Sequence, residues 1–291
     1  MLNSKVIIGT ANFEQQYGIR SKRVDKHKIK EIIQYASKNN INKFDTSASY
    51  KNSEKILGRL LKNNSKVITK LPPIPSNLSI KNTEIWISKK IKESQKKLKI
   101  KNLYALLLHK PDILLTAKGI KIYEFFLKEK KKGNLKKFGI SIYNFNILKK
   151  ILKLYKIDIA QVPFNVFDQR LIKEKNLINK KNNKIEIHCR SIYFQGLLLQ
   201  NEKKLSNKFK KFKIYWKKWD RWLKINQLTP MQASLNFISQ NKKCFKNIVV
   251  GFDSRHQLEE FINYRHKKEK LNFNKFHIKN KKFNKPGLLR K

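Results

Sequence analysis

Short apolar runs alternate with longer stretches of helical hydrophobic period along most of the chain. Continuous apolar runs of a few residues are typical of parallel strands that are buried on both faces. Apolar residues spaced three and four apart are typical of helices that pack one face against such a sheet. The runs predict strands at 6–8, 67–69, 103–108, 138–140, 157–160, 185–189 and 248–250, and a short one that ends at Asp45.

The segments between these strands predict helices. Thr229 and Pro230 mark one helix start, because a capping threonine precedes a proline whose missing N–H is not needed in a first turn. The helices are predicted at 24–39, 53–62, 83–98, 119–131, 145–154, more weakly at 170–180, from 229 onward and at 255–264.

Eight strand–helix units in 291 residues predict an α/β protein, a single-domain (β/α)8 TIM barrel. The barrel domain is expected over 1–264, with an inserted loop at 197–227 after the seventh strand and a basic C-terminal tail at 265–291. A doubly wound open sheet is the alternative, but no glycine-rich phosphate turn follows the first strand.

Polar groups stand at the ends of most predicted strands. In a (β/α)8 barrel the functional site is built at the C-terminal ends of the strands, so these groups are expected to meet at one mouth. Tyr50 follows the end of the second strand by five residues and precedes a helix. The polar residues at the strand ends are Asp45, Lys70, His109, Ser141, Gln161 and Arg190.

Four of these residues form a set suited to proton transfer. A tyrosine with an ordinary pKa of about 10 is a poor proton donor at neutral pH, and a nearby ammonium lowers that pKa. Asp45 is placed to hold Lys70 charged and direct it at Tyr50. A neutral His109 is able to donate a hydrogen bond to a carbonyl oxygen. Together they suit the protonation of an alkoxide as it forms.

These residues and their surroundings resemble the aldo-keto reductase family, from Gly9 to about Phe261. The resemblance implies that Asp45, Tyr50, Lys70 and His109 are a catalytic tetrad, with Tyr50 as general acid, for hydride transfer from a nicotinamide to an aldehyde or ketone. The matching motifs are Phe44-Asp45-Thr46-Ser47-Ala48-Ser49-Tyr50, Glu54-Lys55-Ile56-Leu57-Gly58, Thr69-Lys70, Leu107-Leu108-His109, Gly139-Ile140-Ser141 and Gln161-Val162-Pro163-Phe164-Asn165.

The resemblance also implies a coenzyme site, for NADP with NAD as a second possibility. Ser141 and Gln161 match the positions that hold the carboxamide. The chain departs from the family where Arg190 replaces an aromatic residue that commonly stacks on the nicotinamide, and where Gly251 and Gln257 replace basic residues. The predicted coenzyme-binding residues are Gly9, Thr10, Ser141, Gln161, Arg190, Gly251, Phe252, Ser254, Arg255, Gln257 and Glu260.

The formal net charge of +48 bears on possible partners. Of the 68 basic residues 59 are lysine, whereas recognition of bases and phosphates favours the planar arginine fork. This favours an AT-rich genome as the cause and predicts no specific nucleic-acid partner. Residues 203–224 carry ten basic and one acidic residue, and 265–291 carry eleven and one. An alternative function is therefore a catalytically idle barrel that binds an anionic partner through these segments.

Several remaining features set expectations about location and assembly. No apolar run approaches the roughly 18 residues that a membrane span needs, and the N-terminus does not resemble a signal peptide. Cys189 and Cys244 have neither paired spacing nor metal-ligand partners, so we expect a reduced, cytoplasmic protein without a metal site. We also expect a monomer or weak oligomer. Residues 190–198 resemble a bacterial branch of the family associated with glycan biosynthesis, and this resemblance suggests a sugar derivative as the small carbonyl substrate. The tryptophans at 216, 219 and 222 predict a packed helix face.

Overall fold

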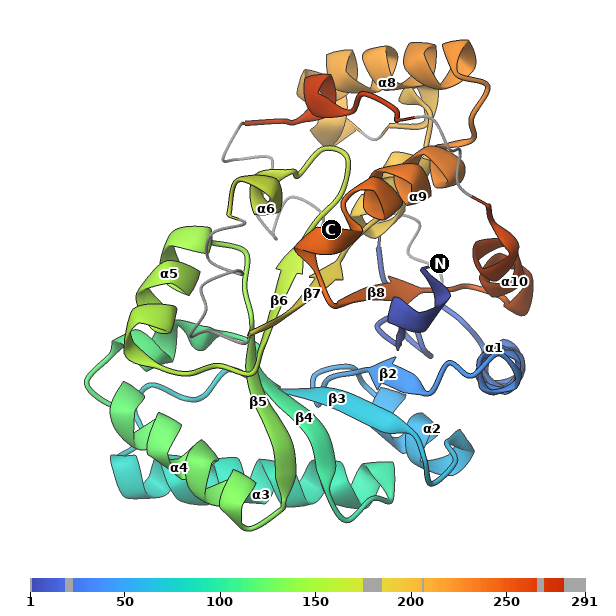
Figure 1. The fold of residues 1–291 in the computed structure, drawn as a ribbon. Coiled ribbons are helices and arrows are strands. Elements are labelled where there is room, and N and C mark those ends of the chain that lie inside the picture. Colours follow the sequence, from blue (N-terminus) through green and yellow to red (C-terminus); the bar gives the residue numbers. More distant parts are fainter. Residues whose placement is uncertain (1, 19–22, 175–184, 206, 266–269, 280–291) are drawn as a thin grey trace.

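The computed structural model describes residues 2–18, 23–174, 185–205, 207–265 and 270–279. Eight parallel strands pair in sequence order and close into a barrel, since β1 pairs with both β2 and β8 (Figure 1). The predicted TIM barrel is confirmed and the open-sheet alternative is wrong. The strands are β1 (Val6–Gly9), β2 (Lys43–Asp45), β3 (Lys66–Leu71), β4 (Leu103–Leu108), β5 (Leu135–Ser141), β6 (Ile159–Pro163), β7 (Glu186–Arg190) and β8 (Asn247–Gly251).

Helices surround the strands, mostly at their predicted places (Figure 1). Thr229 forms a reciprocal capping box with Gln232, which fixes the start of the helix that precedes β8. Much of the helix predicted at 170–180 lies outside the described residues. The helices are α1 (Lys26–Lys38), α2 (Ser53–Leu60), α3 (Ile80–Leu98), α4 (Gly119–Lys131), α5 (Phe145–Leu154), α6 (Arg170–Lys173), α8 (Lys213–Ile225), α9 (Pro230–Gln240) and α10 (Arg255–Asn263).

The inside of the barrel is layered. Alternate residues of the strands form a small apolar cluster separate from the large core between strands and helices; its members are Ile7, Ile68, Ala105, Leu107 and Ile159. Since side chains alternate along a strand, the residues two positions further on also face inward. These are Gly9, Lys70, His109 and Gln161, so an apolar layer lies beneath the polar mouth.

The segment between β7 and α9 is more ordered than the loop that the sequence predicts. It contains 3-10 turns and α8, which lies at the top of Figure 1. Trp216 and Trp219 of α8 are fully buried, and Trp219 stacks on Trp222 with ring centroids 5.5 Å apart. The predicted packed face is therefore confirmed.

Part of the predicted basic tail completes this aromatic cluster. Phe273 and Phe276 are buried and pack against Trp222 at centroid distances of 5.1 and 5.4 Å. The Gln169 amide donates to the Phe273 carbonyl at 2.7 Å, and the backbone N–H of Ile278 donates to Phe167 at 2.9 Å. Residues 270–279 thus hold α8 to the loop after β6.

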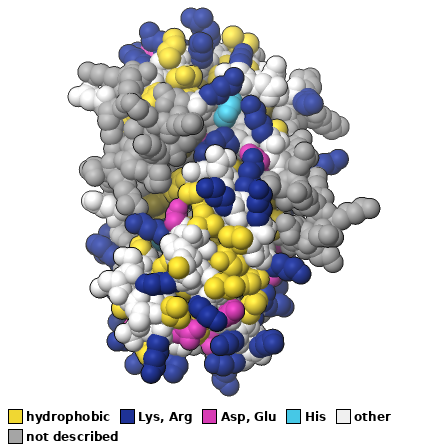
Figure 2. Space-filling model, turned by 90° about the vertical axis from the view of Figure 1, so that its left-hand side faces the viewer, with side chains coloured by type: hydrophobic (Ala, Val, Ile, Leu, Met, Phe, Trp, Pro, Cys, Tyr) yellow, Lys and Arg dark blue, Asp and Glu magenta, His cyan; other side chains and the backbone are white. Residues whose placement is uncertain are grey.

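Among the residues that the structure describes, Lys70 is the one lysine that is buried. On the face drawn in Figure 2, Lys and Arg side chains are spread over the upper and lower parts, among groups of apolar side chains. In the described part of the chain, every helix is too short or too polar to span a membrane.

Gly58 lies where α2 meets α3, and its replacement tests this packing. A Cβ atom there would stand 2.2 Å from the Lys97 carbonyl oxygen and 2.7 Å from the Leu98 carbonyl carbon. We expect Gly58→Ala to lower the free energy of unfolding by about 1–3 kcal/mol, because backbone must shift to admit the methyl group. Urea unfolding followed by far-UV circular dichroism measures this change.

Gly133→Asn is the matched control for this prediction. Gly133 has a φ of +77° with open space around its Cβ position, and asparagine tolerates such a backbone. The control should unfold near the wild-type midpoint. A Gly58→Ala protein as stable as the control would contradict the close packing of α2 on α3.

Candidate active site

A buried ion pair occupies the centre of the barrel mouth. Lys70 Nζ donates to Asp45 Oδ1 at 2.5 Å, and the two residues are only 2% and 4% exposed. Lys70 also donates to the Thr46 carbonyl at 2.9 Å, and Gln161 Nε2 donates to the second carboxylate oxygen of Asp45 at 2.7 Å. Both oxygens of Asp45 are therefore used within the protein.

The environment lowers the pKa of Lys70. Burial is the main cause, since it removes water from the ammonium, while the charge and hydrogen bond of Asp45 oppose the shift. The positive charge of Arg190 acts in the same direction as burial. Without Asp45, the Lys70 ammonium would be a buried charge without a counter-ion.

Neighbouring loops hold Asp45 in place. The backbone N–H and hydroxyl of Thr10 both donate to the Asp45 carbonyl, at 3.0 and 3.1 Å. Ser53 at the start of α2 donates to the Thr10 carbonyl at 3.0 Å. Thr69 donates to the buried Glu54 at 2.7 Å, which ties α2 to β3. These bonds fix the turn from Asp45 to the start of α2 between three strands.

Tyr50 lies in this turn, close to the ion pair. Lys70 Nζ is 5.5 Å from the centroid of the Tyr50 ring. The His109 ring at the end of β4 meets Tyr50 edge-on, with centroids 6.4 Å apart. The structure thus brings together Asp45, Tyr50, Lys70 and His109, although they come from three different strand ends and one turn.

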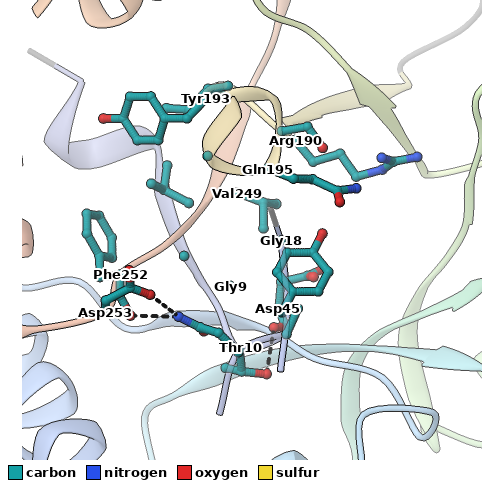
Figure 3. A pocket seen from close by; sticks show the side chains of 18 of the residues that line it. Gly9, Thr10, Gly18, Asp45, Arg190, Tyr193, Gln195, Val249, Phe252 and Asp253 are labelled. Carbon is teal, nitrogen blue, oxygen red and sulfur yellow. Dashed lines mark hydrogen bonds between the residues drawn. The ribbon is translucent and has the colours of Figure 1, made fainter. Parts of the chain in front are cut away.

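A cavity of about 300 Å³ opens beside this cluster (Figure 3). Asp45 and Tyr50 lie on its wall, whereas Lys70 and His109 do not line it. Figure 3 shows Arg190 on the side of the cavity opposite Phe252 and Asp253. Among the predicted coenzyme residues, those that line the cavity are Gly9, Thr10, Gln161, Arg190, Gly251, Phe252, Gln257 and Glu260.

Three predicted coenzyme residues do not line the cavity. Ser141 is buried next to Gln161 in the β5–β6 register. Ser254 caps α10 by accepting a hydrogen bond from the backbone N–H of Gln257 at 3.3 Å. The Arg255 guanidinium lies over the Tyr35 ring, 5.0 Å from its centroid.

The sequence did not identify several residues that line the cavity. Asn12, Tyr17 and Gly18 belong to the loop after β1, and Tyr193 and Gln195 to the loop after β7. The two loops touch, since a Cβ atom on Gly18 would lie 2.8 Å from the Gln195 carbonyl oxygen. Loop residues carry no hydrophobic period, so no pattern marks this contact in advance.

The cavity suits a ligand with its own polar groups. Asn12 donates to the Phe252 carbonyl at 3.0 Å and to Asp253 at 2.9 Å, but its buried Oδ1 atom accepts no hydrogen bond. That atom faces the open Cβ position of Gly251 at 3.8 Å. A buried acceptor without a donor is costly, so this part of the cavity favours a ligand that carries hydrogen-bond donors such as amide or hydroxyl groups.

Comparisons with known proteins bear on the family and the fold. The model of the aldo/keto reductase family matches residues 5–278. The glycerol dehydrogenase of Gluconobacter oxydans has a similar structure, with a TM-score of 0.68, 18% identity and coverage of 90% of this chain and 86% of the other. An aldo-keto reductase of Bacillus halodurans in its holo form is also similar, with a TM-score of 0.67, 18% identity and coverage of 87% of each chain. No curated protein sequence matches.

The buried ion pair generates a testable double-mutant cycle. We expect Asp45→Asn and Lys70→Met each to lower the free energy of unfolding by about 3–5 kcal/mol, because each leaves one buried charge unpaired. The double variant should recover a large part of this loss. Urea unfolding of the four proteins measures the coupling.

Purely additive losses in the four proteins would contradict the pairing. The Lys137–Glu186 pair, with a 2.6 Å contact but side chains 20% and 26% exposed, offers a comparison. Its cycle, with Glu186→Gln and Lys137→Met, should give a smaller coupling because water reaches both groups.

Proposed function

The chain belongs to the aldo/keto reductase family, a family of oxidoreductases, and we propose that it uses NAD(P)H to reduce an aldehyde or ketone to an alcohol. The observation that supports this most is the buried Lys70–Asp45 pair beside Tyr50, at the edge of a cavity. A barrel that served only as a binding module has no need to bury an ammonium next to a phenol. The proposed substrate is a small carbonyl compound such as a sugar derivative.

Each residue of the proposed tetrad has a distinct task. Tyr50 donates a proton to the carbonyl oxygen, and the Lys70 ammonium favours the phenolate that this leaves behind. Asp45 keeps Lys70 charged and in place through their 2.5 Å contact. His109, at the edge of the Tyr50 ring, orients the carbonyl oxygen by hydrogen bonding.

The coenzyme would be held along the cavity and supplies a hydride when bound. Gly9 and Gly251 lack side chains and so leave room for it beside Thr10 on the cavity wall. The amide of Gln161 would receive the carboxamide while its Nε2 group remains on Asp45. Phe252, Gln257 and Glu260 line the end away from the ion pair.

Replacement of Tyr50 tests the proposed proton donor. We expect Tyr50→Phe to lower kcat by about 10²–10⁴-fold, because the phenolic proton is lost while the ring remains. Coenzyme affinity, measured by quenching of intrinsic fluorescence, should persist.

Tyr155→Phe is the control for the tyrosine change. The Tyr155 hydroxyl donates to the Leu114 carbonyl at 3.0 Å, away from the cavity lining. This variant should keep wild-type kcat. If Tyr50→Phe were fully active, Tyr50 would not be the acid, and if neither NADH nor NADPH bound at millimolar concentration, the proposed activity would be lost.

The charge on the cavity wall bears on the choice between NADPH and NADH. Asp253 and Glu260 line the end formed by β8 and α10, whereas Arg255 lies over Tyr35 instead of lining the cavity. A 2′-phosphate there would meet like charges. We expect Asp253→Asn to raise the affinity for NADPH relative to NADH by roughly threefold or more.

Titration of both coenzymes against the wild-type and variant proteins measures this ratio. Asp112→Asn removes an exposed carboxylate far from the cavity lining and should leave the ratio unchanged. An unchanged ratio in Asp253→Asn would place the 2′-phosphate elsewhere. The chain is proposed to act in the cytoplasm, as a monomer or weak oligomer.

A further inference from the structure

Arg190 ends β7 and carries a positive charge into the barrel mouth. Ile187 and Cys189 of β7 belong to the outer core, so Glu186, His188 and Arg190 alternate with them and face inward. Arg190 is the uppermost of the three and lines the same cavity as Asp45 and Tyr50. Its side chain therefore stands at the reacting end of the cavity.

The guanidinium has no counter-ion within the described residues. Its Nε and Nη2 atoms are buried without a hydrogen-bond partner, and no described carboxylate lies within the 4.0 Å of an ion pair. Asp45 is already bonded at both oxygens, to Lys70 and Gln161. Asp253 lies on the opposite side of the cavity (Figure 3).

A second arginine nearby shows what a paired guanidinium looks like in this protein. Arg170 makes two parallel bonds of 2.7 Å to Asp168 and a third of 2.9 Å to the Tyr143 carbonyl. The guanidinium carbon of Arg190 instead lies over the Tyr143 ring, 3.9 Å from its centroid. This cation–π contact holds the guanidinium at the ring but supplies no negative counter-charge.

We propose that Arg190 binds an anionic oxygen group, a carboxylate or a phosphate, on the carbonyl substrate. This inference depends on the proposed function, because it names the class of substrate that the same cavity takes. A charge without a counter-ion in a partly dehydrated site attracts an incoming anion strongly. The planar guanidinium fork matches carboxylate and phosphate oxygens in a bidentate manner.

The position of Arg190 favours the substrate over the coenzyme as the source of this anion. Arg190 lies near the Asp45–Lys70 pair, where its charge acts on Lys70, and away from Phe252 and Asp253 (Figure 3). The carbonyl group must reach Tyr50 at this end. An anionic group on the same small molecule is thus within the same part of the cavity.

Matched aldehydes test the proposal with NADH or NADPH, whichever binds. The carboxylate arm compares 4-carboxybenzaldehyde with benzaldehyde, and the phosphate arm compares glyceraldehyde 3-phosphate with glyceraldehyde. We expect kcat/KM to favour the anionic member of at least one pair by roughly tenfold or more. The arm that shows the preference identifies the anion.

Variants at position 190 connect this preference to the guanidinium. Arg190→Met should reduce the anionic-to-neutral ratio of kcat/KM to near one, and Arg190→Lys should retain part of it because charge remains without the fork. Arg221→Met, which removes an exposed arginine of α8, should leave the ratio unchanged. An equal loss for both members of each pair, together with weaker coenzyme binding, would overturn the proposal and assign Arg190 to the coenzyme.

The failure of this inference differs from the failure of the proposed function. If the neutral aldehydes are reduced but no anionic preference appears, only the inference is overturned. If no aldehyde is reduced, the anion site is still tested by measuring the binding of benzoate and of inorganic phosphate with isothermal titration calorimetry. Binding that Arg190→Met abolishes and Arg221→Met retains supports the anion site, and the absence of wild-type binding overturns it.

Discussion

The arrangement of the barrel mouth depends on the buried carboxylate of Asp45. Its two side-chain oxygens accept from Lys70 and Gln161, and its backbone carbonyl accepts twice from Thr10. One residue of β2 thereby joins β1, β3 and β6. Removing two charges from water is unfavourable, and such a pair persists only where further hydrogen bonds complete it. Here the Thr46 carbonyl and the Gln161 amide supply them.

The barrel gives this pair its dry surroundings. The apolar layer that contains Ile7, Ile68 and Ile159 closes the interior beneath the mouth. Beside this layer, burial lowers the pKa of the inward-facing His188, while the hydrogen bond and charge of Glu186 oppose the shift. Asn247 Nδ2 lies 3.0 Å from His188 Nε2, and the Asn247 side-chain oxygen accepts from Lys43. The apolar cluster beneath the mouth thus limits the access of water to Lys70 from inside the barrel.

The sequence predicted the barrel, and the meeting of Lys70, His109 and Gln161 at its mouth, because both depend on regular spacing. Side chains alternate along a strand, so Lys70, His109 and Gln161 face inward two positions beyond apolar residues that face inward. The predicted strand ends were therefore enough to identify these three residues. The packing of Trp216 also followed from helical period. Asn12, Tyr17 and Tyr193 were missed, because they belong to loops whose course depends on tertiary contacts such as Gly18 against Gln195. The bond from Gln161 to Asp45 likewise follows from geometry that no spacing encodes.

The large excess of lysine does not account for the isolation of Arg190. An exposed ammonium is solvated and needs no partner, so 48 uncompensated charges are compatible with a stable fold. A buried charge, in contrast, needs a counter-ion. Lys70 forms an ion pair with Asp45, and Arg170 forms one with Asp168. Among the described residues, Arg190 departs from this rule on the wall of the cavity. The lysine-rich composition changes the charge of the exposed surface, whereas the guanidinium of Arg190 on the cavity wall is a local feature of the site.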